Sequence, residues 1–210
     1  MVCYMDWIFT ENQKVESMAP YLYSVDCEYD WGGRVNKVTG IKLGLPIILK
    51  IFRLHNIKAI FFISTEVLKH GDSFIKDILL EGHEIGSHGH FHIRFKDRFR
   101  CVEDRYASEA ILKKYLPLPN VPFRYRAPRF NREDSRDFYS CRKSHVSILK
   151  HSWIGGKIPN DAIFYIHPFD IVGGSNAPNL LSKMLYSRPK RVYDDFVKLV
   201  NFYPGNERLV

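Results

Sequence analysis

No stretch of this 210-residue chain stays apolar for the ~20 consecutive residues that a membrane-spanning helix requires. Residues 1–14 lack a basic start followed by an apolar run, which argues against a secretory signal. The chain has only four cysteines, and no Cys-x-x-Cys pair occurs among Cys3, Cys27, Cys101 and Cys141. Neither a zinc ribbon nor a dense disulfide framework is therefore expected. These absences predict a cytoplasmic protein with reduced thiols and no transmembrane segment.

Acidic residues are in the minority, with 23 against 31 lysines and arginines, so the formal net charge is +8. Such a balance favours anionic partners, including nucleic acid, phosphorylated sugars and an acidic membrane surface. The excess is spread along the chain, however, and its densest runs, 94–100 and 188–191, are short. No nucleic-acid recognition motif accompanies them, so we expect solvated basic faces and no nucleic-acid partner.

Predicted strands and helices alternate along the chain. Apolar runs predict strands at 20–26, 58–64, 121–126 and 162–166. Amphipathic patterns predict helices at 40–55 (beginning near Pro46), at 65–80 with a break near Gly71, at 102–115 and at 191–202. This alternation favours βα units around a parallel sheet. We expect a single domain over 1–210, with its core at about 20–175 and a C-terminal helix at 191–202.

The segment 83–92 contains a concentration of histidines. His88 and His92 have the i, i+4 spacing that places two imidazoles on one face of a helical turn, a convergence that suits a divalent metal. Clustered surface histidines are the alternative for this motif alone. A zinc-protease motif is excluded, because His88 follows His83 by five residues and not by four. His90, at i+2, is expected to face away in a structural or substrate-contact role.

Other polar residues follow predicted strands. Asp26 and Glu28 are two residues apart in an extended segment, so both can face one site, one as a metal ligand and the other as a base. Arg126 can hold a carboxylate through a two-pronged contact, although a surface arginine beside a turn is the alternative. His167 can act as an acid near neutral pH, although a lone histidine that ends a strand is more often structural. The carboxyl ends of strands form the site in βα folds.

In combination, four motifs resemble those of the polysaccharide deacetylase family, that is, carbohydrate esterase family four, which includes chitooligosaccharide and peptidoglycan deacetylases. They are "SVDCEYDWGG", "HEIGSHGHFH", "FRYRAPRF" and "FYIHPFDI", and the resemblance runs from about Tyr21 to Val172. The first motif resembles the variant with Asp-x-acid in place of two adjacent aspartates. The resemblance implies an α/β fold, a distorted and incomplete (β/α) barrel.

The resemblance also implies a role for each matching residue. Glu28, His88 and His92 match the ligands of one divalent metal ion, usually zinc. Asp26 matches the general base, Arg126 the residue that orients it, and His167 the general acid. Substrate contacts are expected at Trp31, Pro128 and Arg129.

The predicted function is metal-dependent removal of an N-acyl group, most simply acetyl, from an amino sugar or glycan precursor. The precursor can be phosphorylated or lipid-linked, and contact with a membrane surface stays open. The segment between the third and last motifs, 131–160, is shorter than the family leads us to expect. Two alternatives therefore remain: a cyclic amide (allantoin-type) hydrolase on the same barrel, and a non-catalytic carbohydrate- or metal-binding relic.

Overall fold

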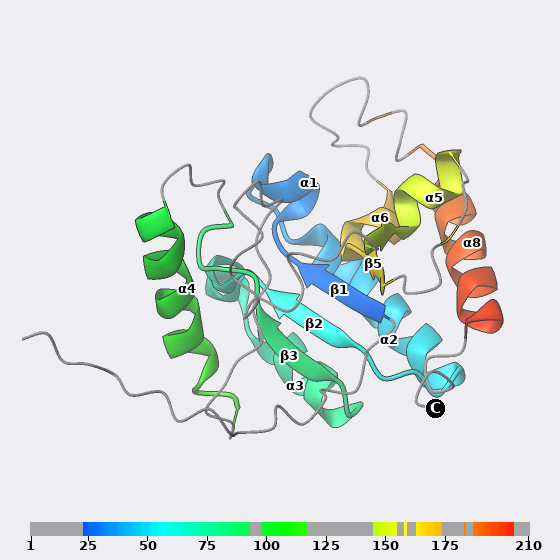
Figure 1. The fold of residues 1–210 in the computed structure, drawn as a ribbon. Helices are drawn as coiled ribbons and strands as arrows, with labels where there is room; N and C mark the ends of the chain where they lie inside the picture. The colour runs from blue at the N-terminus through cyan, green and yellow to red at the C-terminus, as the bar shows by residue number, and fades with distance from the viewer. Residues whose placement is uncertain are drawn as a thin grey trace, which may run out of the picture.

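Five parallel strands form the centre of the protein (Figure 1). The computed structural model describes residues 23–92, 98–116, 145–154, 158, 163–173, 183 and 187–203. Its strands are β1 (Tyr23–Cys27), β2 (Ile60–Ile63), β3 (Glu84–Ser87), β4 (His145–Ser147) and β5 (Ile163–Ile166). All neighbouring pairs are parallel, in the order β3-β2-β1-β5-β4. Within the described residues the sheet is open and does not close into a barrel.

Helices connect and flank these strands. They are α1 (Asp30–Gly33), the π-helix η1 (Gly40–Gly44), α2 (Leu45–Leu54), the 3-10 helix η2 (Thr65–His70), α3 (Ser73–Leu80), α4 (Arg98–Leu112), α5 (Ile148–Ile154), α6 (Pro168–Val172) and α8 (Pro189–Phe202). α4 lies at the β3 edge of the sheet, and α5 and α8 lie at the opposite edge (Figure 1). None of the described helices is both long and apolar enough to span a bilayer.

β2 forms because its residues are apolar on both sides. All four of them are fully buried, as expected for an interior strand of a parallel sheet. α2 begins at Leu45 with Pro46 in its first turn, where a missing backbone N–H costs nothing. Its buried side chains, among them Ile48 and Phe52, pack into the main core.

The C-terminal helix is attached to the central strand by one tyrosine. Tyr23, at the start of β1, is buried, and its hydroxyl donates to the backbone carbonyls of Leu199 (3.1 Å) and Tyr203 (2.8 Å). Its ring also packs near Phe196 of α8, with centroids 6.4 Å apart. β1 is thereby fixed against α8 as well as against its two neighbouring strands.

Most predicted elements are confirmed. Strands predicted at 20–26, 58–64 and 162–166 are β1, β2 and β5, and the predicted break near Gly71 separates η2 from α3. The strand predicted at 121–126 lies outside the described residues. β4 and α5 were not predicted, because β4 has only three residues and neither element has a clear periodic pattern.

Candidate metal centre

The predicted site residues meet at the carboxyl edge of the sheet. Asp26 and Glu28 stand at the end of β1, His88 and His92 follow β3, and His167 follows β5. β1 lies between β2 and β5, so the strand order reverses there, which is the position where open α/β sheets bind ligands. The topology therefore brings residues from three separated motifs to one place.

Glu28, His88 and His92 form a compact buried cluster. The Glu28 Oε2 atom lies 2.5 Å from His92 Nε2 and 3.4 Å from His88 Nε2. One ligand-type atom from each of the three residues lies within 4.8 Å of the others. Two imidazole nitrogens and one carboxylate oxygen are the donor set of hydrolytic zinc sites, which keep a further position open. The residues present therefore fit a divalent metal ion.

The carboxyl group of Glu28 is ionised in spite of its burial. Burial by itself raises its pKa, but the charge of His92, hydrogen bonds with His88 and His92, and the charge of His167 outweigh burial and hold the pKa well below its ordinary value. The group is thus in the charged form that a metal ligand requires.

The histidine segment is an irregular turn, so the predicted helical turn is wrong. β3 ends at Ser87, and the residues after it are not helical, with positive φ angles at Gly89 (+81°) and His92 (+52°). Asp104 of α4 stabilises this turn, because its carboxylate accepts the backbone N–H groups of His90 (3.0 Å) and Phe91 (2.9 Å). The two imidazoles still converge, with ring centroids 4.3 Å apart, but through a turn supported by α4.

His90 takes no part in the cluster. Its Nδ1 atom lies 2.9 Å from the Thr65 hydroxyl, and its carbonyl accepts a hydrogen bond from the Ser64 hydroxyl at 3.1 Å. These contacts tie the turn to the end of β2 and favour the structural role over substrate contact.

Asp26 lies beside the cluster and is buried. Its Oδ2 atom is 3.9 Å from His88 Nε2 and 3.9 Å from His167 Nε2. Asp26 thus lies between His88, a candidate metal ligand, and His167, the candidate acid. These distances are short enough for one small substrate to contact all three residues.

His167 faces the cluster from β5 and is held by an aspartate that sequence reasoning missed. Its Nε2 atom lies 3.6 Å from Glu28 Oε1, and its Nδ1 lies 3.2 Å from Asp170 Oδ2. The same Asp170 oxygen accepts the backbone N–H of His167 at 2.8 Å. Burial by itself lowers the pKa of His167, but the charge and hydrogen bond of Asp170, followed by the charges of Glu28 and Asp26, raise it to about 9.

A helix-capping pattern in the sequence could have identified Asp170 as a partner of His167. The residue stands three positions after His167 and two after Pro168, in the first turn of α6, where a side chain can reach back to the residue that precedes the helix.

The structure describes only one of the four remaining predicted residues, Trp31. Arg126, Pro128 and Arg129 lie outside the described residues. Trp31 is buried, and its ring centroid is 5.7 Å from that of Phe169, so it packs beside α6. Its contact with substrate stays a prediction.

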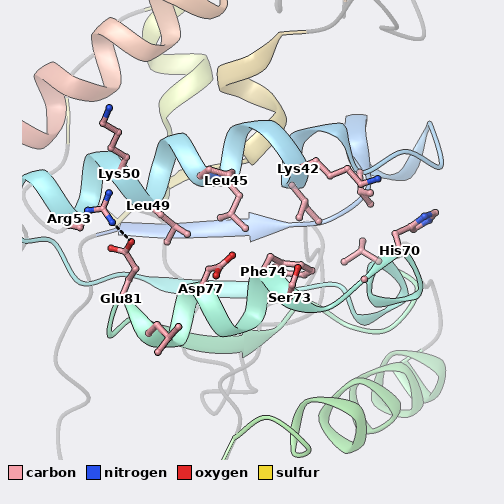
Figure 2. A pocket seen from close by; sticks show the side chains of 16 residues that line it. Lys42, Leu45, Leu49, Lys50, Arg53, His70, Ser73, Phe74, Asp77 and Glu81 are labelled. Carbon is pink, nitrogen blue, oxygen red and sulfur yellow. Dashed lines mark hydrogen bonds and ion pairs between the residues drawn. The ribbon is translucent and has the colours of Figure 1, made fainter.

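A groove of about 550 Å³ between α2 and α3 is distinct from the cluster (Figure 2). Leu45, Leu49 and Phe74 contribute apolar side chains to it, and Arg53 donates to Glu81 at 2.9 Å across one end. None of the residues that line it belongs to the histidine–carboxylate cluster. Because the groove lacks that constellation, the carboxyl edge of the sheet is the candidate active site.

Comparisons with known proteins bear on the family and on the fold. Residues 39–135 match the family model for polysaccharide deacetylase. No curated protein matches the chain. Among solved structures, BA3943 from Bacillus anthracis, described as a CE4 family pseudoenzyme, is 18% identical with a TM-score of 0.51. The alignment covers 80% of this chain and 60% of that one.

Two structures from Bacillus subtilis have the same TM-score, 0.51. PdaA, a family 4 carbohydrate esterase, is 18% identical, and the match covers 84% of this chain and 74% of PdaA. The peptidoglycan deacetylase PdaC is 13% identical, with 86% and 92% covered. At these identities the likeness shows the fold alone, and it confirms the predicted α/β class. The family match, over residues 39–135, confirms the resemblance to the polysaccharide deacetylase family that the four motifs indicate.

Proposed function

We propose that this protein is a metal-dependent hydrolase that removes an N-acyl group, most simply acetyl, from an amino sugar or glycan precursor. The observation that carries the proposal is the buried Glu28–His88–His92 cluster, flanked by Asp26 and by His167. A ligand set, a base and an acid are the three parts that amide hydrolysis requires, and this cluster contains one candidate for each.

Glu28, His88 and His92 would hold the metal, which we propose to be zinc. When bound, a divalent metal polarises an amide carbonyl and lowers the pKa of a water. The protein's part is to keep Glu28 ionised and to orient both imidazole Nε2 atoms toward it.

The proton transfers belong to Asp26 and His167. Asp26 accepts a proton from the attacking water while the water oxygen bonds to the carbonyl carbon. The carbon–nitrogen bond then breaks, and His167 gives its proton to the leaving nitrogen, so that a carboxylic acid and a free amine result. With a pKa of about 9, His167 is protonated at neutral pH and ready to donate. We keep Arg126 as the residue that orients Asp26.

Two observations support the proposed substrate class, the family match and the net charge of the chain. The family match supports a carbohydrate substrate, and the net charge of +8 is compatible with a phosphorylated or lipid-linked sugar. We propose that residues 1–210 act as one catalytic domain.

The test uses zinc-loaded protein and a panel of N-acetylated amino sugars, chitooligosaccharides and a cyclic amide. Acetate and free amine should appear in equal amounts. Asp26→Asn should lower the rate by at least ~100-fold, the usual contribution of a positioned base, while zinc content is kept. Asp77→Asn, on α3 and away from the cluster, is the matched control.

Two results would overturn the proposal. Zinc bound at one equivalent without release from any substrate would indicate a non-catalytic binding protein. Turnover of the cyclic amide alone would indicate the allantoin-type reaction instead.

A further inference from the structure

We propose that Gly40 and Gly44 of η1 are positioning residues that seat the His-Pro motif and thereby set the location of the His167 imidazole. The inference rests on the proposed role of His167 as the acid of the reaction. It concerns the contact between η1 and α6, two short helices that are distant in sequence and closely packed in space.

The contact is between backbones, and a side chain would destroy it. A Cβ atom added at Gly40 would lie 2.5 Å from the Phe169 nitrogen and 2.8 Å from its Cα. A Cβ added at Gly44 would overlap the carbonyl oxygen of Pro168. Real Cβ atoms do not approach backbone atoms so closely, and a backbone atom cannot turn aside as a flexible side chain can. Gly44 has ordinary helical angles (φ −84°, ψ −38°), so space and not conformation requires glycine there.

η1 is itself anchored to the segment that directly follows β1 and contains Glu28. The buried Asp30, two residues after Glu28, accepts the backbone N–H groups of Thr39 and Gly40, each at 2.9 Å. These bonds fix the start of η1 relative to the end of β1. A continuous path therefore links Asp26 and Glu28, through Asp30 and η1, to the backbone of α6.

From α6 the path continues to the imidazole. Phe169 stacks on His167 with ring centroids 4.8 Å apart and planes inclined by 17°, and Trp31 packs 5.7 Å from Phe169. Asp170 of the same helix holds His167 Nδ1. If α6 moves away from η1, the groups that hold the imidazole move with it, while Glu28, His88 and His92 remain on other elements.

The expected displacement is large enough to measure. Relieving the overlap at Gly44 requires α6 to retreat by about 1.5 Å, to restore ordinary contact distances. A misplacement of that size in a reacting group costs on the order of 100-fold in rate. The loss of rate should affect the step in which His167 gives its proton to the leaving nitrogen.

The experiment compares two substrates on zinc-loaded Gly44→Ala and Gly40→Ala. An N-acetyl amino sugar needs a protonated leaving nitrogen, whereas 4-nitrophenyl acetate releases a stable phenolate without help. Both variants should lose about 100-fold in kcat on the amide and less than about 5-fold on the ester, with KM and zinc affinity unchanged. Lys42→Ala, at an exposed position of the same helix η1, is the matched control. Equal loss on both substrates, or no loss on either, would overturn the proposal.

A crystal structure of each variant separates this inference from the proposed function. The proposal requires His167 Nε2 to move away from Glu28 Oε1, beyond its 3.6 Å in the native protein, while Glu28, His88 and His92 keep their places. If the native protein hydrolyses neither substrate, the proposed function fails, and this displacement alone decides the positioning role. Phe169→Leu keeps the contact with η1 but removes the ring that stacks on His167. Even if the glycine variants do not fold, this variant should lose more amide activity than ester activity, by a smaller factor than the one expected for the glycine variants. An unmoved His167, or a Phe169→Leu variant whose amide and ester rates fall equally, contradicts the proposal.

Discussion

Acid should destabilise this protein through His83, a buried histidine outside the candidate site. It lies just before β3, 5% exposed, with its ring 5.0 Å from Phe61 and 5.6 Å from Phe52. Its Nδ1 atom accepts the backbone N–H of Ala59 at 3.3 Å, so Nε2 carries the proton of the neutral ring. That Nε2 has no hydrogen-bond partner among the described residues. A charged imidazole is therefore strongly disfavoured at this position.

The size of the effect follows from the pKa of His83. Burial, with a smaller contribution from the charge of Lys58, lowers it from 6.5 to about 4. Between these values the unfolded chain binds more protons than the folded one, so stability is fully present above pH 6.5 and is lost as the pH falls toward 4. The free energy of unfolding should decrease by about 1.4 kcal/mol at pH 5.5 and about 3 kcal/mol at pH 4 from this residue alone.

The assay is urea unfolding of metal-free protein at pH 7, 5.5 and 4, for the native chain and for His83→Asn. Asparagine keeps an acceptor for the Ala59 N–H group but does not titrate. Every other titrating group is common to both proteins. The difference between their unfolding free energies should therefore change with pH only through His83. Parallel pH profiles for the two proteins would refute the reasoning.

Three further changes test separate contacts. Asp170→Asn should lower the pKa of His167 from about 9 in an NMR titration of metal-free protein, because the charge that raises it is lost, and an unchanged value would contradict this. Tyr23→Phe removes two hydrogen bonds to the end of α8 and should cost about 1 kcal/mol in urea unfolding, with equal stability as the opposing result. Gly89→Ala places a Cβ against the carboxylate of Asp104 at a φ of +81° and should weaken zinc affinity at least ~10-fold by calorimetry. Unaltered affinity would show that the turn tolerates the change.

The sequence was most informative where burial imposes a pattern. β2 is a run of apolar β-formers, and α2 repeats apolar residues at helical spacing, so both were predicted near their observed positions. The convergence of Asp26, Glu28 and His167 also follows from sequence, because parallel strands place their carboxyl ends on one edge. A strand of three residues such as β4 carries too little pattern to be distinguished from a loop.

Long-range contacts account for what was not predicted. The spacing of His88 and His92 fits a helical turn, but it equally fits an irregular turn with positive φ at Gly89, and the long-range contacts with Asp104 and with the end of β2 favour the second. The tight seat that Gly44 provides for α6 likewise depends on packing between distant segments, and it leaves no periodic signal.

Anomalous diffraction at the zinc edge, from crystals grown with one equivalent of zinc, tests the central claim most directly. The account predicts a single strong peak about 2.0–2.2 Å from His88 Nε2, His92 Nε2 and an oxygen of Glu28, with Asp26 and His167 nearby but not coordinated. A peak elsewhere on the chain, or one coordinated by Asp26 in place of Glu28, would contradict it.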